Sequence, residues 1–284
     1  MMQINVAFCN RPSYDNPLGG DAIQMLKTKE WLEILYGIHI SIITHPNVCM
    51  ATYNGGQYLK AQIDSILNQL SVNDELVISD DHSTDNTCAI IKQYNDSRVK
   101  LVLNELTKGV THNFENALLH SNGDIIFLAD QDDIWLPTKI KELSQFLLHG
   151  DYDVVTGNCA LTDSKLNVLQ SEYYTTQSPL DKSVCGNFVK NLWLGSCMAF
   201  KRKVLLATLP FPKKMATHDL WIALYSQLHF KCGYYPKVLQ LYRRHDNTVS
   251  FAGSKSTNKL SYKISYRLYL VYWLLVRSGI KVWK

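Results

Sequence analysis

The acidic run Asp130-Gln131-Asp132-Asp133 directly follows the apolar stretch 125–129. Ionised carboxylates this close together repel one another in a partly desolvated site, unless a cation or a raised pKa relieves them. Mg²⁺ and Mn²⁺ prefer oxygen ligands, and carboxylates often share such an ion with phosphate oxygens. The aspartates could instead cap a helix that starts near Pro137, but a cap needs a single residue of this kind. The run therefore predicts a metal and phosphate site.

Strand-like and helix-like segments alternate from about Val48 onward, which is typical of an α/β fold with a mostly parallel sheet flanked by helices. Strands are predicted at 48–52, 76–78, 99–103 and 125–130, with another starting at Val154. Helices are predicted between them, including one that Ser83 or Thr84 could cap.

Polar clusters follow three of these strands, at 52–54, 80–81 and 130–133. Ligands of open α/β sheets bind where the strands present their carboxyl ends. Loops favour Asp and Asn in any case, so one such cluster is weak support. Three clusters at successive strand ends predict one shared pocket.

Composition limits the classes of protein to which this chain can belong. A chain of 284 residues with 46% hydrophobic content can bury a sizeable core. Its seven cysteines are scattered without Cys-x-x-Cys pairs, which predicts reduced thiols and not a disulfide frame or a zinc site. No secretory signal precedes the first strand, and no apolar run reaches the length of a membrane span. We expect a cytoplasmic protein.

The net charge of +4 is concentrated in the C-terminal segment. Residues 254–284 contain no acidic residue and seven basic ones, Lys255, Lys259, Lys263, Arg267, Arg277, Lys281 and Lys284. An apolar and Tyr-rich helical stripe from Leu260 accompanies this charge. Such a helix suits the surface of an anionic membrane, or it packs back on the rest of the chain. Nucleic-acid binding has only this tail charge in its favour, so we do not expect it.

Three stretches, 50–55, 78–85 and 127–135, resemble the hallmark motifs of bacterial family 2 glycosyltransferases with the GT-A fold, of the O-antigen and capsule type. The likeness extends to 194–200, 218–221 and 241–245 and covers about 48–251. It implies a Rossmann-like, mixed and mostly parallel sheet.

The resemblance also implies an activity, namely inverting transfer of a hexose from a nucleoside diphosphate sugar, helped by Mg²⁺ or Mn²⁺. UDP-glucose or UDP-galactose is the favoured donor, and dTDP-rhamnose is next. The implied acceptor is a polyprenyl-diphosphate-linked oligosaccharide in surface polysaccharide synthesis, on the inner face of the cell membrane.

Matched position by position, Thr52 and Tyr53 would hold the nucleobase, Asp81 would bond its edge, and Asp130 would lie near the ribose. Tyr53 has an alternative, which is packing against Tyr58 or the sheet.

Asp132 would bind the metal, and His245 stands where relatives place a His or an Arg near the diphosphate, so we count it with the metal ligands. Arg243 is a second candidate for the diphosphate, and Asp219 matches the base that activates the acceptor. His245 could equally be a loop histidine, and Asp219 could also cap a helix.

Two features depart from the family pattern. Residues 1–47 are not required by it, and 16–29 resemble the opening β-α-β of a GT-B glycosyltransferase. We therefore divide the chain into an appendage at 1–47, a catalytic domain at 48–251 and a basic helix at 252–284. The second departure is His112, where many relatives place an Arg that faces the donor.

Two other classes remain open on the residues alone. A sugar nucleotidyltransferase also joins an α/β sheet to metal-binding aspartates, but the turn at 52–57 lacks the basic residue that such enzymes carry. A non-catalytic sugar-nucleotide-binding protein left by a gene fusion would account for residues 1–47 and for His112.

Overall fold

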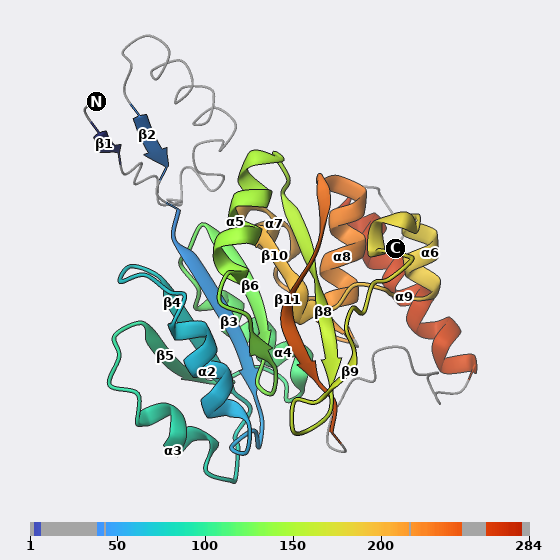
Figure 1. Cartoon of the computed structure of the whole chain (residues 1–284). Coiled ribbons are helices and arrows are strands. Elements are labelled where there is room, and N and C mark those ends of the chain that lie inside the picture. Colours follow the sequence, from blue (N-terminus) through green and yellow to red (C-terminus); the bar gives the residue numbers. More distant parts are fainter. Residues whose placement is uncertain (1–2, 7–38, 43, 216, 246–259, 280–284) are drawn as a thin grey trace.

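The computed structural model describes residues 3–6, 39–42, 44–215, 217–245 and 260–279 (Figure 1). The strands are β1 (Gln3–Val6), β2 (His39–Ile42), β3 (Pro46–Thr52), β4 (Glu75–Asp80), β5 (Val99–Leu103), β6 (Ile125–Asp130), β7 (Ile134–Trp135), β8 (Val154–Thr162), β9 (Val168–Gln170), β10 (Met198–Lys201) and β11 (Cys232–Arg243). The helices are α2 (Leu59–Leu67), α3 (Thr87–Lys92), α4 (Val110–Leu119), α5 (Lys139–His149), α6 (Val184–Val189), α7 (Arg202–Thr208), α8 (His218–His229) and α9 (Leu260–Arg277), with short 3-10 turns η1 (Pro179–Asp181) and η2 (Gly195–Cys197).

The main sheet has the strand order β5-β4-β3-β6-β10-β8-β11-β7, and β9 pairs with β8. The first four strands are parallel, whereas β10 runs antiparallel to both of its neighbours. The predicted mixed, mostly parallel α/β sheet is confirmed. In its register Thr52 lies opposite Asp80, and Ala51 lies opposite Asp130. The three polar clusters therefore lie at one edge of the sheet.

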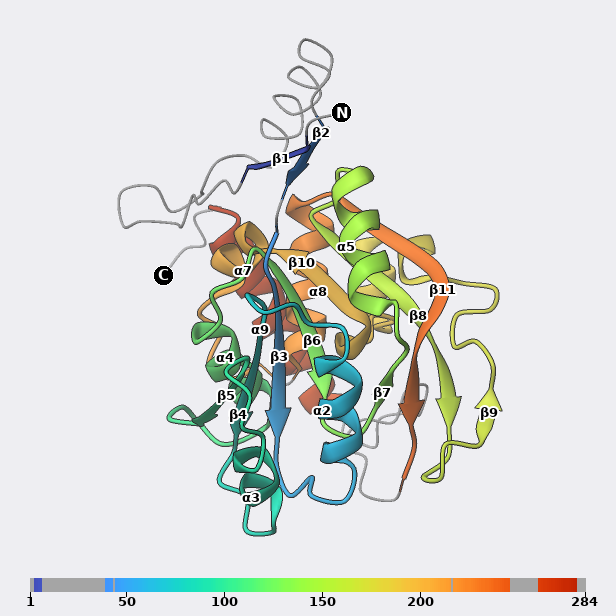
Figure 2. The ribbon, with the colours of Figure 1, turned by 60° about the vertical axis from the view of Figure 1, so that its left-hand side comes forward.

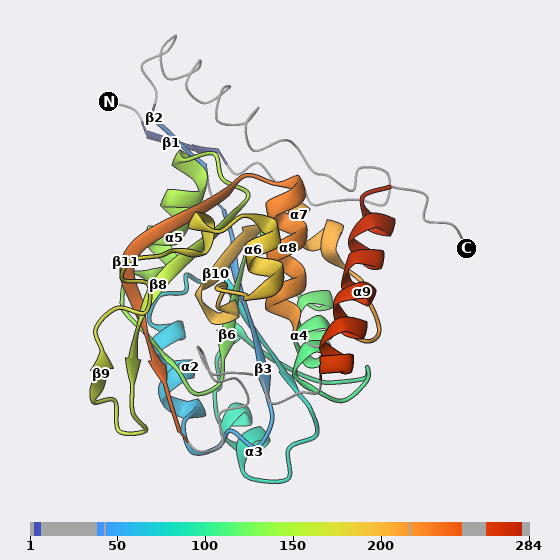
Figure 3. The ribbon, with the colours of Figure 1, turned by 90° about the vertical axis from the view of Figure 1, so that its right-hand side faces the viewer.

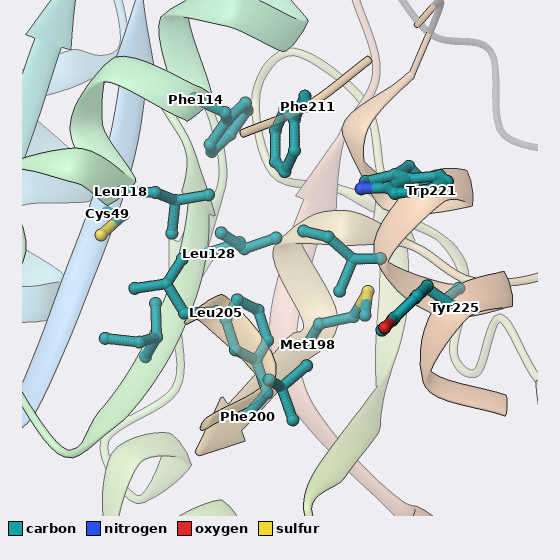
Figure 4. Packing of buried hydrophobic residues seen from close by; sticks show 14 of the residues in the cluster. Cys49, Phe114, Leu118, Leu128, Met198, Phe200, Leu205, Phe211, Trp221 and Tyr225 are labelled. Atoms are coloured by element: carbon teal, nitrogen blue, oxygen red, sulfur yellow. The ribbon is translucent and has the colours of Figure 1, made fainter. Parts of the chain in front are cut away.

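Successive residues of a strand point to opposite faces of its sheet. All residues of β3 are buried, so both faces of the sheet are covered at this strand. Val48 and Met50 pack with α2 and α5, and Cys49 and Ala51 pack with the cluster that contains residues of α4, α7 and α8. Figure 2 shows α2 and α5 in front of the sheet and α8 behind it. Figure 4 shows the second cluster, in which Phe114 of α4 and Trp221 of α8 lie over strand residues such as Leu128. These two layers hold the strand ends in place.

The helix after β4 starts later than predicted. Ser83 and Thr84 do not cap it, because α3 begins at Thr87. The Ser83 hydroxyl donates to Asp80 Oδ2 (2.6 Å), and the Thr84 N–H donates to Asn54 Oδ1 (2.9 Å). These residues therefore fasten the loops at two strand ends together.

At the N-terminus, β1 and β2 form a separate parallel pair in which Gln3 lies opposite His39. The predicted helix between them, with residues 7–38, lies outside the described residues. The division at residues 47 and 251 stays a prediction.

The C-terminal helix packs on the main body. Leu270 and Leu274 of α9 are buried in the same cluster as Trp221 and Tyr225 of α8. Of the two alternatives for the tail, packing is therefore observed. Among the described residues, no helix combines the length and the apolar character needed to cross a membrane.

Candidate active site

The acidic run continues from the last residue of β6 into the loop before β7, and its members have different contacts. Asp133 is buried, and its carboxylate accepts hydrogen bonds from Gln240 Nε2 (3.0 Å) and from the Arg243 backbone N–H (3.0 Å). Asp132 Oδ2 lies 2.8 Å from His245 Nε2. The N-cap of α5 is Thr138, so the interpretation of the run as a helix cap is wrong.

The carboxylates of this run act on one another electrostatically. Burial, the charge of Asp132 and, more weakly, that of Asp219 raise the pKa of Asp130 to about 7. The pKa of Asp133 is also well above its usual range, chiefly through burial and then through Asp132 and Asp130. The charge of Asp219, the predicted base, is thus among those that raise the pKa of Asp130.

Such crowding fits a divalent cation, which would relieve the repulsion. Asp132 and His245 are brought together as a pair and offer an oxygen and a nitrogen. In the part of the chain that the structure describes, no three Asp, Glu, His or Cys side chains form a metal cluster. An ion here would complete its coordination with oxygens of a bound ligand, as Mg²⁺ commonly does with phosphates.

Tyr58, just before α2, contacts both basic side chains at the end of β11. Its ring centroid lies 4.5 Å from Arg243 Cζ and 4.8 Å from the centroid of the His245 ring. Arg243 is buried and donates from Nε to the Asp132 carbonyl (2.7 Å) and from Nη1 to the Ser164 carbonyl (2.7 Å). The structure thus fixes a positive charge directly against the acidic loop.

Thr52 and Tyr53, at the end of β3, differ in their exposure. Thr52 is buried, and its hydroxyl donates to Asp80 Oδ2 (3.0 Å). Tyr53 is 55% exposed, so its ring is not buried against the sheet. The Gln131 side chain holds the Tyr53 backbone, accepting from its N–H (2.9 Å) and donating to its carbonyl (3.1 Å). An aromatic ring is thus presented beside the acidic run on a fixed backbone.

Asp81 follows β4 and is almost fully buried. Its Oδ1 accepts from Asn104 Nδ2 (2.7 Å), and its Oδ2 accepts from the Gly109 N–H (2.8 Å). A carboxylate offers about four lone-pair positions, so both oxygens keep acceptor capacity. Asp81 is oriented to accept further hydrogen bonds.

Asp219 lies in the first turn of α8, whose N-cap is Thr217 and not Asp219. Its carboxylate accepts from Asn191 Nδ2 (3.2 Å) and from the Leu220 N–H (2.7 Å). Gly195 packs against this turn, where an added Cβ would come within 3.3 Å of Asp219 Cβ. The close approach of Gly195 therefore holds the motif at 194–200 against the predicted base.

His218, next to Asp219, is a structural residue. Its ring stacks on Phe114 with 3.9 Å between centroids, and burial lowers its pKa. The imidazole is therefore neutral near pH 7 and adds no positive charge beside Asp219.

Both ring nitrogens of His112 lie within hydrogen-bond distance of other groups of the protein. Its Nδ1 lies 2.8 Å from Glu115 Oε2, and its Nε2 lies 3.1 Å from the Lys213 carbonyl oxygen. Glu115 Oε1 in turn accepts from the Phe211 N–H (2.6 Å). Where the family pattern has an Arg, this chain uses the histidine to fasten α4 to the segment before α8.

Sequence reasoning missed a buried lysine behind the acidic run. Lys139 Nζ lies 3.9 Å from the centre of the Trp135 ring and donates to the Ser196 carbonyl (2.6 Å) and to Gln240 Oε1. Gln240 also bonds Asp133, so the lysine supports the loop through one intermediary. Burial lowers the pKa of Lys139 to about 8. The sequence gives one weak indication that Lys139 supports the acidic loop, namely that this residue follows closely on the motif at 127–135.

Replacing Lys139 with Met is expected to destabilise the fold by about 3 kcal/mol. The buried Ser196 carbonyl and Gln240 Oε1 would lose their charged hydrogen-bond donor, and Asp133 would lose a nearby positive charge. Urea unfolding measures this loss. The control is Lys141→Met on the same helix, where the side chain is exposed and a change within about 0.5 kcal/mol is expected. Equal unfolding midpoints for the two variants would show that the lysine does not support the loop.

Comparison with known proteins shows which family the sequence of this chain matches. The sequence model of Glycosyl transferase family 2 matches residues 47–206, which is more than half of the chain. The Escherichia coli UDP-Glc:alpha-D-GlcNAc-diphosphoundecaprenol beta-1,3-glucosyltransferase WfgD is 27% identical, over 72% of this chain and 79% of the relative. The Campylobacter jejuni GalNAc(5)-diNAcBac-PP-undecaprenol beta-1,3-glucosyltransferase is 30% identical, over 80% of this chain and 71% of the relative.

Solved structures share the fold at lower sequence identity. Residues 1–349 of Staphylococcus aureus TarS, crystallised with UDP, superpose with a TM-score of 0.62 at 18% identity, over 82% of this chain and 65% of that one. The glucosyl-3-phosphoglycerate synthase of Mycobacterium tuberculosis, crystallised with Mn²⁺, UDP and glucosyl-3-phosphoglycerate, superposes with a TM-score of 0.53 at 18% identity, over 84% of this chain and 81% of that one. This chain spans just under two thirds of the TarS fragment. The fold is that of GT-A glycosyltransferases.

Proposed function

The chain belongs to glycosyl transferase family 2, and from that membership we propose that it transfers a hexose, with inversion, from a nucleoside diphosphate sugar to a lipid-diphosphate-linked oligosaccharide. UDP-glucose or UDP-galactose is the favoured donor, and dTDP-rhamnose is next. The two curated relatives, both named as glucosyltransferases acting on undecaprenol-linked sugars, support this choice. The reaction would serve surface polysaccharide synthesis at the cytoplasmic face of the membrane.

The observation that carries the proposal is that the short η2 turn contacts both groups of carboxylates. Gly195 packs against the first turn of α8, beside Asp219. The Ser196 hydroxyl accepts from Gln240 Nε2, which also donates to Asp133 of the acidic run. Inverting transfer needs one carboxylate to move a proton and others to hold a cation at the leaving group. The carboxylates proposed for these two tasks come from distant parts of the chain and adjoin the same turn.

Asp219 acts as the base. It takes the proton of the acceptor hydroxyl as that oxygen attacks the anomeric carbon, on the face opposite the nucleoside diphosphate. The bond from the anomeric carbon to the diphosphate oxygen breaks as the new bond forms, through an oxocarbenium-like state. Asn191 donates to Oδ2 of Asp219 and the Leu220 N–H donates to Oδ1, which orients the carboxylate. Each oxygen keeps a further lone pair that can accept the proton of the acceptor.

Asp132 and His245 would hold Mg²⁺ or Mn²⁺, which when bound neutralises charge that develops on the departing diphosphate. Arg243 adds a fixed positive charge beside the same loop. The Mycobacterium structure of the same fold, which contains Mn²⁺ and UDP, supports the assignment of the ion.

At the other end of the donor, Tyr53 stacks on the nucleobase and Thr52 borders it. Asp81 accepts a hydrogen bond from the edge of the base, because its oxygens keep acceptor capacity after binding Asn104 and Gly109. Asp130 lies nearer the ribose, at the end of β6.

The test is an assay of the purified full chain with UDP-glucose, UDP-galactose and dTDP-rhamnose, a synthetic polyprenyl-diphosphate-linked sugar, and Mn²⁺. We expect one donor to give a lengthened lipid-linked product with an inverted anomeric centre, read by mass and NMR. Release of inorganic diphosphate from a nucleoside triphosphate would indicate a nucleotidyltransferase instead. Donor binding without turnover on any acceptor would indicate the non-catalytic alternative.

A further inference from the structure

The C-terminal helix α9 has two apolar faces, and only one of them is covered. Leu270 and Leu274 face the core, beside Trp221 and Tyr225 of α8. Figure 3 shows α9 lying along α8, on the side of the molecule away from β9 and β11. The inner face therefore gives the helix a fixed place on the catalytic fold.

Hydrogen bonds hold α9 to two segments of the body, the end of α6 and residues 209–214. Arg267 Nη2 donates to the Val189 carbonyl at the end of α6 (2.7 Å). The Tyr269 hydroxyl accepts from the Lys214 N–H (3.2 Å), and Arg277 Nη1 donates to the Leu209 carbonyl (3.0 Å). These contacts lie in the middle and at the C-terminal end of α9, and they set the rotation of the helix about its own axis.

This rotation leaves a second apolar stripe in solvent. The exposed large side chains of α9 are Ile264, Leu268, Val271, Tyr272 and Val276, of which Leu268 is 66% exposed. Their spacing of three or four residues puts them on one side of the helix, opposite Leu270 and Leu274. Val189, whose carbonyl binds Arg267, is also exposed and extends the apolar surface toward α6. A continuous stripe of this kind indicates a partner.

The segment that contains α9 is basic. Residues 254–284 carry seven basic residues and no acidic one. Arg267 and Arg277 bind carbonyls of the body, so their charges lie where α9 meets the body and not on the stripe itself. A second copy of the chain would place two such basic segments side by side, whereas anionic lipid headgroups complement their charge.

We propose that the outer stripe of α9 inserts into the interface of an anionic lipid bilayer while the inner face stays docked on α8. An exposed apolar face on a helix that is basic and rich in aromatic residues is the pattern of helices that lie in the plane of a membrane. The two roles that the sequence left as alternatives, packing and membrane contact, are thus carried by opposite sides of one helix.

The contacts of α9 also connect the proposed membrane helix to the residue proposed as the base, a connection that rests on the proposed function. The segment that α9 holds, through the Leu209 carbonyl and the Lys214 N–H, leads into α8, whose first turn carries Asp219.

Flotation of the full chain with vesicles tests the proposal. We expect binding to phosphatidylcholine vesicles that contain phosphatidylglycerol, and weak binding to phosphatidylcholine alone. The double variant Leu268→Glu/Tyr272→Glu is expected to bind the anionic vesicles at least about tenfold less, because two charges would enter the interface. The matched control Val72→Glu/Leu119→Glu adds the same charge at exposed apolar positions elsewhere and should bind as wild type does.

Equal binding by the two double variants would overturn the proposal, as would a wild-type protein that ignores both kinds of vesicle. A wild-type dimer in lipid-free solution that Leu268→Glu/Tyr272→Glu converts to monomers would assign the stripe to a second copy instead. Urea unfolding of each variant checks that the fold survives. Vesicle binding by Asp219→Asn separates this proposal from the proposed activity, because a protein that catalyses no transfer would still bind lipid.

Discussion

Replacing Asp219 with Asn is expected to lower kcat for sugar transfer by about a thousandfold, because a general base typically contributes 10²–10⁴-fold. The amide cannot take the acceptor proton. The amide oxygen can replace Oδ1 and still accept from the Leu220 N–H, whereas the amide NH2 replaces Oδ2 and loses the hydrogen bond from Asn191. Because the bond within the turn is kept, the first turn of α8 should keep its shape. Initial rates at saturating donor and acceptor measure the loss.

The matched control for this change is Asp64→Asn, which makes the same substitution at a surface ion pair with Lys60. Its kcat should equal that of the wild type. The affinity of Asp219→Asn for UDP, measured by calorimetry, should also be unchanged, because Asp219 acts on the acceptor and not on the nucleotide. Undiminished transfer by Asp219→Asn would assign the base elsewhere.

The second large effect is expected for Asp132→Asn. Loss of one carboxylate from a site that holds a divalent ion removes several kcal/mol of charge stabilisation at the leaving group, or about a thousandfold in kcat. The same variant should bind Mn²⁺ at least about a hundredfold more weakly in the presence of UDP. Rates measured across a range of Mn²⁺ concentrations read out both effects.

High Mn²⁺ should restore part of the rate of Asp132→Asn, since weakened binding is overcome by mass action. It should not restore Asp219→Asn, whose defect is in proton transfer. If Asp132→Asn required the same Mn²⁺ concentration as the wild type, the ion would have to lie elsewhere, and His245 would be a loop histidine held by Asp132.

The strand ends were predictable because local sequence determines them. A buried parallel strand needs a continuous apolar run, and residues 48–52 and 125–130 are such runs, each ending at a polar residue. Given parallel neighbours, their polar ends must share one edge of the sheet. The relative positions of Thr52, Asp80 and Asp130 follow from those two facts.

The supporting side chains were not predictable, because their partners are far away in the sequence. Gln131 holds the Tyr53 backbone, 78 residues before it, and Lys139 binds Gln240, 101 residues after it. Asn191 orients Asp219 from a segment whose local pattern resembles an ordinary loop. Such residues have no local sequence signal, because their role depends on the tertiary fold.

The tail shows a different limit. Residues 260–277 are apolar on more than one side of the helix, so periodicity alone could not choose the buried face. Ile264 and Leu268, which form the apparent stripe in the sequence, are exposed, whereas Leu270 and Leu274 are buried. Packing against α8 and against the segment before it determines which side of α9 is buried.

The most direct test of the metal site is diffraction from crystals grown with Mn²⁺ and UDP, using anomalous scattering at the manganese absorption edge. The account predicts one strong peak about 2.1 Å from a carboxylate oxygen of Asp132 and from oxygens of the UDP diphosphate. Bound UDP with no anomalous peak beside Asp132, or with the peak at another group, would contradict it.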